Sequence, residues 1–281
     1  MDDFFADGLS AETKGKYIEL IRDIDSLGSV AVALSGGVDS SLLAKICHDR
    51  LGNQAIAATI VSPMLAKREL EDACKVATLV GIRHFLIHEI DIVPEVRKNP
   101  VNRCYFCKKI EFGRIIDEAK KRNIAYVLDG SNLDDMDDYR PGSLAVKELE
   151  VQSPLQKAGF TKQEIRALSR MLGLPTSDKP AYACLASRIP YAEEITIEKL
   201  SRIDKAEAYL QSLGLDGLRV RSHENIARIE VRPEQRHCFF DTGMMDAISK
   251  QLKSFGFVFV CLELEGYSMG NLNKEISING Q

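Results

Sequence analysis

The chain has 281 residues, of which 45% are hydrophobic and 28% charged, which is enough apolar material for one sizeable core and a smaller second one. Its formal net charge of −4 gives no overall attraction to nucleic acid, so small substrates are favoured and nucleic acid is not expected as a partner. The N-terminal MDDFFADGLS is acidic and no long apolar run appears, which predicts no membrane span, no secretion signal and a cytoplasmic location.

The first half of the chain alternates helical and strand-like segments. Apolar residues recur at helical spacing, and short apolar runs bounded by glycines or polar turns separate them. The pattern predicts helices at about 11–27, 38–51, 66–80 and 106–122, and strands at 30–34, 55–61, 83–87 and 125–128. Strands that alternate with helices indicate an α/β fold with a doubly wound parallel sheet.

In the second half of the chain, the predicted helices and strands no longer alternate regularly. Thr161 followed by Glu164 is a capping-box pattern and predicts a helix over 162–172, after which comes a proline-containing loop that is long for a mere connector. From about residue 196 we predict a helix, strands at 218–221 and 226–231, a helix at 235–255 and a strand at 257–264. We therefore predict two domains, residues 1–190 and a smaller α+β domain over residues 191–281.

A glycine- and serine-rich turn, SGGVDSS at residues 35–41, follows the first predicted strand and opens the next helix. Free backbone N–H groups and the dipole at a helix N-terminus attract anions, and glycines let the backbone approach a phosphate closely. An ordinary strand-to-helix turn would need neither clustered serines nor an acid that suits a magnesium ion. The predicted phosphate-binding residues are Ser35, Gly36, Gly37, Asp39, Ser40 and Ser41, with Asp39 also holding Mg²⁺.

SGGVDSS resembles the signature of the PP-loop ATP pyrophosphatases, which cleave ATP between its α and β phosphates and transfer AMP to a substrate. DGSNLDD at residues 129–135 follows a later predicted strand and resembles the second nucleotide-site motif of that superfamily, although alone it could be an Asp/Asn-rich turn. The resemblance implies ATP and Mg²⁺ as cofactors and places Gly130 at the nucleotide. Neither GxxxxGK[ST] nor GxGxxG is present, which removes most support for a kinase or a dehydrogenase.

Seven cysteines, an odd and scattered set, are not typical of a disulfide framework and indicate reduced thiols. Cys104 and Cys107 form a CxxC among cations at a helix entrance, and Cys184 lies in the long loop near an arginine; these settings favour the reactive thiolate. The other four are predicted to be small buried hydrophobic residues, namely Cys47, Cys74, Cys238 and Cys261.

A lone CxxC has several explanations: a redox dithiol, half of a structural zinc site or part of an iron–sulfur cluster. The second CxxC of an all-cysteine zinc site is missing, whereas zinc with a histidine ligand stays open. Three thiolates can also hold a four-iron cluster with one iron open, which could carry a hydrosulfide. A nucleotide loop together with a sulfur nucleophile suits sulfur transfer, because adenylylation creates AMP as a leaving group for sulfur to displace.

Five segments give a more specific resemblance, which covers nearly the whole chain: ALSGGVDSSLLA, NRCYFCK, LDGSNLDD, ACLASRIP and GLRVRSHENIARIEV. Together they resemble LarE, the ATP-dependent sulfur transferase family of nickel-pincer nucleotide biosynthesis. The resemblance implies a pyridinium dicarboxylate mononucleotide as substrate, conversion of its carboxylates to thiocarboxylates, a sulfide donor and a homo-oligomer. It also implies a 4Fe-4S cluster on Cys104, Cys107 and Cys184, with Cys184 and Asp39 as catalytic residues.

Several charged residues are candidates for the substrate site. Arg219 and Arg221 alternate along a predicted strand and so share a face, where two guanidiniums could bind a phosphate; a solvated strand face is the alternative. By the resemblance, Arg188, Glu207 and Glu230 lie near the substrate, although acids on a helix or strand are usually just solvated.

Three rival functions stay open. A tRNA thiolase of the PP-loop group would use the same chemistry on another substrate, but the acidic net charge opposes it. An ammonia-dependent amidating synthetase would need no cysteine cluster. A nucleotide-binding or zinc-stabilised interaction protein would bind ATP without releasing pyrophosphate.

Overall fold

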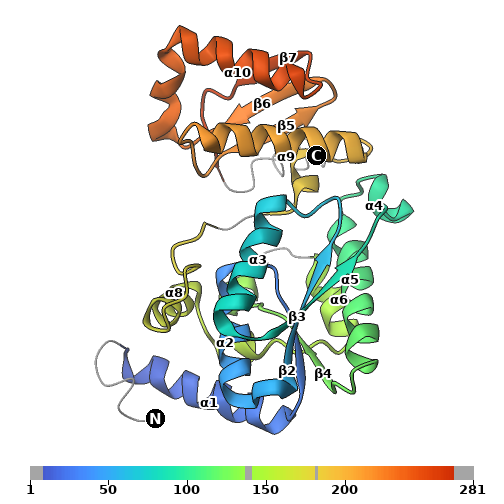
Figure 1. The fold of residues 1–281 in the computed structure, drawn as a ribbon, viewed down its shortest axis with the longest axis vertical. Coiled ribbons are helices and arrows are strands. Elements are labelled where there is room, and N and C mark those ends of the chain that lie inside the picture. The colour runs from blue at the N-terminus through green and yellow to red at the C-terminus, as the bar shows by residue number, and fades with distance from the viewer. Residues whose placement is uncertain (1–8, 137–140, 181–182, 269–281) are drawn as a thin grey trace, which may run out of the picture. The chain divides into compact units, whose positions relative to one another are not determined.

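The computed structural model describes residues 9–136, 141–180 and 183–268, which divide between two compact units. Of these, unit 1 contains residues 9–61, 67–89, 102–136 and 141–180, and unit 2 contains residues 62–66, 90–101 and 183–268. Each unit is described below by itself (Figure 1). The domain boundary between residues 190 and 191 stays a prediction.

Unit 1 is built on a four-stranded parallel sheet in the order β3-β2-β1-β4. Its strands are β1 (Val30–Ala33), β2 (Ala55–Val61), β3 (Arg83–His88) and β4 (Tyr126–Leu128). The chain runs outward from β1 through β2 to β3 and then returns to the other side of β1 to form β4. The predicted α/β fold with a parallel sheet is confirmed, and the strand order reverses between β1 and β4.

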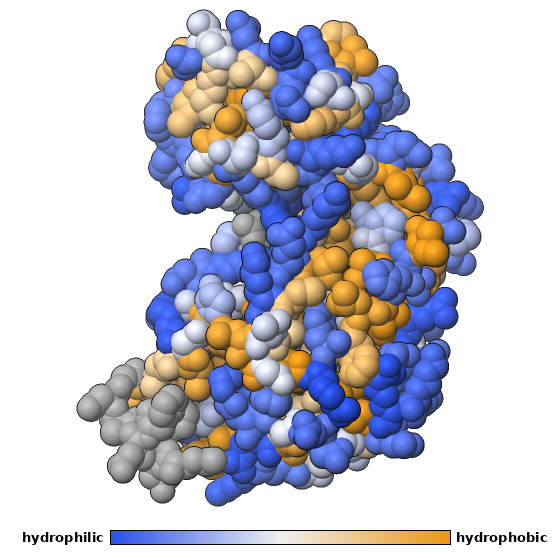
Figure 2. Space-filling view, viewed as in Figure 1, coloured by the Kyte–Doolittle hydropathy of each residue, from blue (hydrophilic) through white to orange (hydrophobic). Residues whose placement is uncertain are grey.

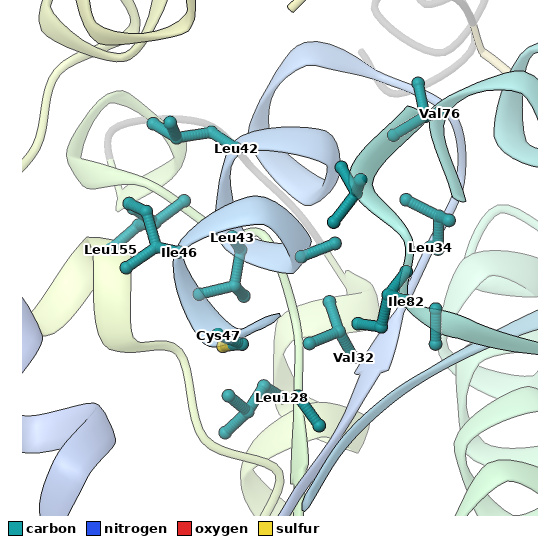
Figure 3. Close-up of a cluster of buried hydrophobic side chains, with 14 of the residues drawn as sticks. Val32, Leu34, Leu42, Leu43, Ile46, Cys47, Val76, Ile82, Leu128 and Leu155 are labelled. Carbon is teal, nitrogen blue, oxygen red and sulfur yellow. The ribbon is translucent and has the colours of Figure 1, made fainter. Parts of the chain in front are cut away.

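Helices cover both faces of this sheet because side chains alternate along each strand. Val30 and Val32 of β1 point into the core under one set of helices, whereas Ala31 points into the core under the other. Figure 3 shows the first core, with Val32 and Leu128 beneath the side chains of α2. The first face carries α1 (Ala11–Leu27), α2 (Val38–Leu51), α3 (Lys67–Val80), α7 (Pro154–Lys157) and α8 (Lys162–Met171), and the second carries α5 (Arg103–Lys120) and α6 (Pro141–Glu148).

Local signals set the helix bounds in unit 1. Ser10 caps α1 by accepting a hydrogen bond from the Thr13 backbone, and Gly28 ends that helix in a left-handed conformation. The predicted capping box is confirmed: Thr161 accepts from the Glu164 backbone while the Glu164 carboxylate accepts from the Thr161 backbone. Two short 3₁₀ turns complete the unit, η2 (Gly52–Gln54) and η3 (Leu133–Met136).

Unit 2 contains a three-stranded mixed sheet in the order β5-β6-β7, against which α9 and α10 pack. Its remaining elements are short turns of helix. The bounds are α4 (Pro94–Arg97), η4 (Leu185–Arg188), α9 (Ile197–Ser212), β5 (Arg219–His223), β6 (Ile226–Glu230), η5 (Pro233–Phe240), α10 (Thr242–Ser254) and β7 (Phe259–Leu262).

The predicted helix over residues 235–255 is wrong in part, because the segment is two elements. Pro233 starts a 3₁₀ helix, and Asp241 then interrupts the run in an extended conformation. The Asp241 carboxylate accepts a hydrogen bond from the Met244 backbone and so begins α10 as its N-cap.

The surface of unit 1 is apolar around its open sheet edge. Figure 2 shows hydrophobic residues gathered around β3, an outer strand of the sheet, on which Leu86 is exposed. Among the helices that the structure describes, none is long and apolar enough to cross a membrane.

Candidate active site

The site in unit 1 lies where the strand order of the parallel sheet reverses. β1 and β4 are neighbours, and the chain leaves β1 into SGGVDSS and leaves β4 into DGSNLDD. In open α/β sheets, ligands bind beyond the carboxyl ends of the strands at such a switch point. The fold therefore brings the two predicted nucleotide motifs to one place.

Gly36 has a conformation and a packing that only glycine meets. Its φ is +71°, and a Cβ atom there would lie 2.7 Å from the Ala73 backbone nitrogen and 2.9 Å from the Glu69 carbonyl oxygen. These two atoms belong to the backbone of α3, which cannot move aside as the end of a flexible side chain could. The loop consequently lies against α3, and its tight turn depends on the missing side chain.

Gly130 brings the second motif against the first. A Cβ atom on Gly130 would lie 2.8 Å from the Ser40 backbone nitrogen and 3.2 Å from the carbonyl carbon of Asp39. A backbone-to-backbone approach of this kind needs glycine on one side. The structure thus places Gly130 beside the first turn of α2, although its role at a nucleotide stays a prediction.

The first turn of α2 is open for an anion. Gly37 is the N-cap residue and provides no side-chain cap, so the first amides of the helix remain for another partner. The Ser41 hydroxyl donates to the Gly37 carbonyl at 2.7 Å, and the Ser40 hydroxyl lies 3.0 Å from that of Ser35. The buried Ser40 and Ser41 hydroxyls therefore brace the loop itself.

Asp39 lies at the junction of both motifs, with each carboxylate oxygen held by a different residue. Asn132 Nδ2 donates to Oδ1 at 3.2 Å, and the Lys162 ammonium donates to Oδ2. Asn132 is fully buried, whereas the Lys162 side chain is 33% exposed. A carboxylate held in the phosphate loop suits a cation bound to a polyphosphate.

Hydrogen bonds of Asp129 hold the second motif in place. Its carboxylate accepts hydrogen bonds from the hydroxyls of Ser131 and Ser153, both at 2.6 Å. Its backbone nitrogen donates to the Gln152 carbonyl at 2.9 Å, next to the bridge between Gln152 and Leu128. These bonds fix the position from which Gly130 approaches α2.

Two lysines at the site were not predicted from the sequence. Lys162 is the first residue of α8, and Lys179 donates from Nζ to the Gly36 carbonyl at 2.8 Å while pairing with Asp72. A weak signal for Lys162 was present, because the helix dipole disfavours a cation in the first turn of a helix and so favours an acid close to it. Lys179 had no such signal, since its partners come from distant parts of the chain.

Cys104 and Cys107 lie inside α5, which begins at Arg103 and so earlier than the predicted helix over 106–122. They are three residues apart and therefore share a helix face; Cys104 is exposed and Cys107 half-buried. Cys107 Sγ donates to Glu111 Oε1 at 3.3 Å. Two accessible thiols in one turn are chemically suited to a soft metal centre.

Cys184 lies in unit 2 and is exposed at the start of η4. Arg188, which is 0% exposed, donates from Nη1 to the carbonyl oxygens of Ala183 and Cys184. Its other nitrogens form a two-pronged pair with the Glu207 carboxylate at 2.9 and 3.0 Å. Since Glu207 also accepts from the Val220 backbone at 3.1 Å, Arg188 fixes the Cys184 turn to α9 and β5.

Arg219 and Arg221 alternate on β5 and are both buried, so the alternative of a solvated strand face is wrong. Arg221 pairs with the buried Glu230 and also donates to the Ser187 carbonyl at 2.7 Å. Arg219 stacks on the Tyr267 ring at 4.9 Å, and burial lowers the pKa of its guanidinium. The buried Glu207 and Glu230 are likewise not solvated surface acids.

The structure brings the predicted residues together in three groups. The phosphate loop, Gly130 and Asp39 meet in unit 1; the CxxC pair also lies in unit 1; and Cys184 with the arginines and glutamates lies in unit 2. Within residues 9–136, 141–180 and 183–268, no three His, Cys, Asp or Glu side chains form a group that could hold a metal ion. The three-cysteine cluster site therefore stays a prediction.

The prediction that the other four cysteines are buried is right for Cys47 and wrong for Cys261. Cys47 is a residue of α2 whose side chain lies in the core, where burial raises the pKa of its thiol well above the usual range. Cys261 lies on β7, an outer strand of its sheet, and is exposed. Cys74 and Cys238 are half-buried.

The fold and the loops at its switch point define a nucleotide-binding α/β protein of the PP-loop class. A family model described as NAD synthase matches residues 18–107, which include SGGVDSS and the CxxC. An uncharacterized protein of Synechocystis sp. is 46% identical over 94% of this chain and 99% of its own length.

The pyridinium-3,5-bisthiocarboxylic acid mononucleotide synthase of Lactiplantibacillus plantarum is 36% identical over 93% of this chain and 95% of its own length. A tRNA-specific 2-thiouridylase of Caldanaerobacter subterraneus is 29% identical over 53% of this chain. The chain belongs to the LarE family, that of the pyridinium-3,5-bisthiocarboxylic acid mononucleotide synthase.

Proposed function

We propose that this protein is an ATP-dependent sulfur transferase of nickel-pincer nucleotide biosynthesis. It adenylylates a carboxylate of a pyridinium dicarboxylate mononucleotide and converts it to a thiocarboxylate. The observation that carries the proposal is the close approach of Gly130 to Ser40, which unites the two nucleotide motifs at the switch point. Membership of the LarE family supports the substrate.

The first half-reaction uses the residues of the phosphate loop. The phosphates of Mg²⁺·ATP bind the open first turn of α2, between Ser35 and Ser41, and Asp39 faces the magnesium ion. An oxygen of the substrate carboxylate attacks the α-phosphorus, the bond to the β-phosphate bridging oxygen breaks, and pyrophosphate leaves. The product is an acyl adenylate, in which AMP is a good leaving group.

The second half-reaction needs a sulfur nucleophile. The exposed thiols of Cys104 and Cys184 and the half-buried thiol of Cys107 have the donor chemistry for a 4Fe-4S cluster, which when bound would supply sulfide for transfer. Without that group, the Cys184 thiolate itself attacks the acyl carbon and expels AMP. The Cβ–Sγ bond of Cys184 then breaks as a base removes the Cα proton, so that the sulfur stays on the product as a thiocarboxylate and residue 184 becomes dehydroalanine. Arg188 holds the Cys184 turn in place in either case.

The substrate is proposed to bind in unit 2. Arg219 and Arg221 share one face of β5 and offer guanidiniums to the phosphate of the mononucleotide. The ion pairs of Arg188 with Glu207 and of Arg221 with Glu230 hold this part of the site in shape. A cytoplasmic location, a homo-oligomer and a separate sulfide donor belong to the same proposal.

The test is a reaction of anaerobically purified protein with Mg²⁺·ATP, sulfide and pyridinium-3,5-dicarboxylic acid mononucleotide. We expect pyrophosphate release together with a product in which sulfur replaces a carboxylate oxygen, seen by mass spectrometry. Asp39→Ala should lose both, and Cys184→Ala should keep pyrophosphate release and lose sulfur transfer. Loss of both in Cys184→Ala would contradict this division of roles.

The same assay separates the rival functions. Pyrophosphate release with tRNA and not with the mononucleotide would show a tRNA thiolase, which the partial match to a 2-thiouridylase makes the second candidate. Release that depends on ammonia and gives an amide would show an amidating synthetase. Binding of ATP with no release on any of these substrates would show a binding protein.

A further inference from the structure

The aromatic ring of Tyr267 lies against the guanidinium of Arg219. The two residues are far apart in the chain, since Arg219 opens β5 and Tyr267 follows β7. The guanidinium carbon of Arg219 is 4.9 Å from the centre of the ring, a distance at which the negative face of an aromatic ring attracts a cation. The ring therefore attracts the guanidinium from one side, without accepting a hydrogen bond from it.

The turn that carries Tyr267 is fixed by backbone contacts. Gly266 has a φ of +83°, and a Cβ atom there would lie 2.7 Å from the Val231 carbonyl oxygen, so only glycine fits this close approach. The Tyr267 backbone nitrogen donates to that same oxygen at 2.7 Å. Val231 directly follows β6, and Glu230 at the end of β6 pairs with Arg219 in the register of the sheet. The ring is thus anchored to the strand next to the arginine that it contacts.

Arg219 is a buried cation with other cations near it. Burial lowers the pKa of its guanidinium, and so does repulsion from Arg188 and Arg221, whereas the Glu207 carboxylate raises it. Like charges repel, so contacts that fix one orientation of the guanidinium are needed if it is to bind a ligand at a set place. The Tyr267 ring is one such contact.

An aromatic ring stabilises a cation in a different way from a carboxylate. A carboxylate takes up N–H groups of a guanidinium, as Glu230 does with two nitrogens of Arg221. A ring attracts the charge through its face and takes up none of the N–H groups, which lie in the plane of the guanidinium. Contact with Tyr267 therefore leaves these donors of Arg219 for acceptors, one of which is the Leu218 carbonyl at 2.7 Å.

We propose that Tyr267 is a positioning residue for the substrate: it holds Arg219 in the orientation in which the guanidinium binds the phosphate of the mononucleotide. The ring acts through the arginine and does not itself touch the phosphate. This inference rests on the proposed function, in which Arg219 is one of two arginines that bind this phosphate. It adds the residue that sets the orientation of the arginine, and it assigns the turn at Gly266 to the substrate site.

Calorimetric titration of the full chain with pyridinium-3,5-dicarboxylic acid mononucleotide tests the proposal. Tyr267→Leu should weaken binding about fivefold to thirtyfold, as loss of a desolvated cation–π contact does. Binding of the dephosphorylated nucleoside should stay within about twofold, because it lacks the group that Arg219 holds. Tyr267→Phe keeps the ring and should bind both ligands as the parent protein does. The matched control is Tyr209→Leu, which removes another half-buried tyrosine of unit 2, one that contacts Phe255.

A double variant separates action through Arg219 from general packing. In an Arg219→Met background, Tyr267→Leu should cause no further loss of mononucleotide binding, since the residue through which it acts is gone. If Arg219→Met binds too weakly to measure, the comparison of mononucleotide with nucleoside in Tyr267→Leu decides. Thermal unfolding confirms that the variants fold. Equal losses for the two ligands, losses that add in the double variant, or normal binding by Tyr267→Leu would each overturn the proposal.

These outcomes are separate from those of the sulfur-transfer assay. If the parent protein binds the mononucleotide more tightly than the nucleoside but releases no pyrophosphate with it, the proposed function fails and the role of Tyr267 is still decided by binding. If Tyr267→Leu binds as the parent does, the role of Tyr267 fails and the proposed function stands. A parent protein that binds the mononucleotide no more tightly than the nucleoside would overturn both the phosphate site in unit 2 and the role of Tyr267.

Discussion

Gly130 and Ser40 approach so closely that a single methyl group would separate their loops: a Cβ atom on Gly130 would lie 2.8 Å from the Ser40 backbone nitrogen. The two residues are distant in sequence but belong to turns at the ends of adjacent strands. The gap between these turns is thus set by backbone contact.

The first prediction concerns this contact. Gly130→Ala should weaken Mg²⁺·ATP binding about fivefold to a hundredfold, because overpacking of about 1–3 kcal/mol must displace the first turn of α2. Calorimetric titration measures the dissociation constant. The control is Gly15→Ala in the middle of α1, where a Cβ meets nothing within 4 Å. That variant should bind ATP normally and gain about 0.5–1 kcal/mol in stability. Equal ATP binding by both variants would refute the importance of the contact.

The second prediction concerns the cysteines. Anaerobically purified protein should contain about four irons per chain with matching labile sulfide, and Cys104→Ser should lose them. Cys261→Ser is the matched control, because Cys261 is an exposed cysteine outside the predicted set, and it should keep the iron. Iron analysis and visible absorption give the answer. Stoichiometric zinc, or no metal, would instead favour a structural CxxC or a sacrificial Cys184.

The third prediction concerns the buried pair of Arg188 and Glu207. Arg188→Met should lower the free energy of unfolding by about 3–5 kcal/mol, because it leaves the Glu207 carboxylate buried without its guanidinium. Urea denaturation measures this change. Lys45→Ala, which removes an exposed helix pair with Asp49, should cost no more than about 0.5 kcal/mol.

The double variant Arg188→Met/Glu207→Leu extends this test. It should recover most of the lost stability, because neither charge remains buried. Sulfur transfer should stay impaired, since the carbonyl oxygens of Ala183 and Cys184 have lost the donor that fixed the turn. Recovery of both properties together would show that Arg188 has no part in positioning Cys184.

The fourth prediction is a pH dependence of stability. His84 lies 2.8 Å from the Thr59 hydroxyl, which donates to the Leu34 carbonyl just before the phosphate loop, so the imidazole Nε2–H is the donor to Thr59. Burial lowers the pKa of His84 below its ordinary value. The unfolded chain then binds the proton more readily, so the stabilisation is complete above about pH 6.5 and is lost as the pH falls below it.

Urea unfolding between pH 7.5 and pH 5.5 measures this effect. His84→Gln should lose less stability over that range than the parent protein. His88→Gln, an exposed histidine at the end of the same strand, should behave like the parent. If both variants lose stability as the parent does, burial of His84 is not the cause.

Much of the α/β architecture could be predicted because its signals are local. The apolar run before SGGVDSS, the helix opened by Gly37 and the capping box at Thr161 each depend on neighbours in sequence, and the structure has them within a residue or two. The break at Asp241 was missed because the apolar spacing continues across it. A single side-chain cap decided the outcome there.

The sequence motifs of the site could be predicted, whereas the contacts that their residues make with distant parts of the chain could not. The approach of Gly130 to Ser40 depends on which strands are neighbours, and the pairing of Lys162 with Asp39 depends on where α8 packs. Burial of Glu207 and Glu230 also could not be read from sequence, since acids on helices and strands are usually solvated. Tertiary packing overrode that tendency by supplying arginine partners.

The stretches that build unit 2 are widely separated in the chain, and this has a consequence for its biogenesis. Met64 accepts a hydrogen bond from the Leu185 backbone, and Asn99 donates to the carbonyl oxygens of Ile189 and Pro190. Residues 62–66 and 90–101 therefore leave the ribosome long before their partners exist. The small unit must be the last to fold during synthesis, and it cannot be transplanted between proteins as one continuous genetic segment.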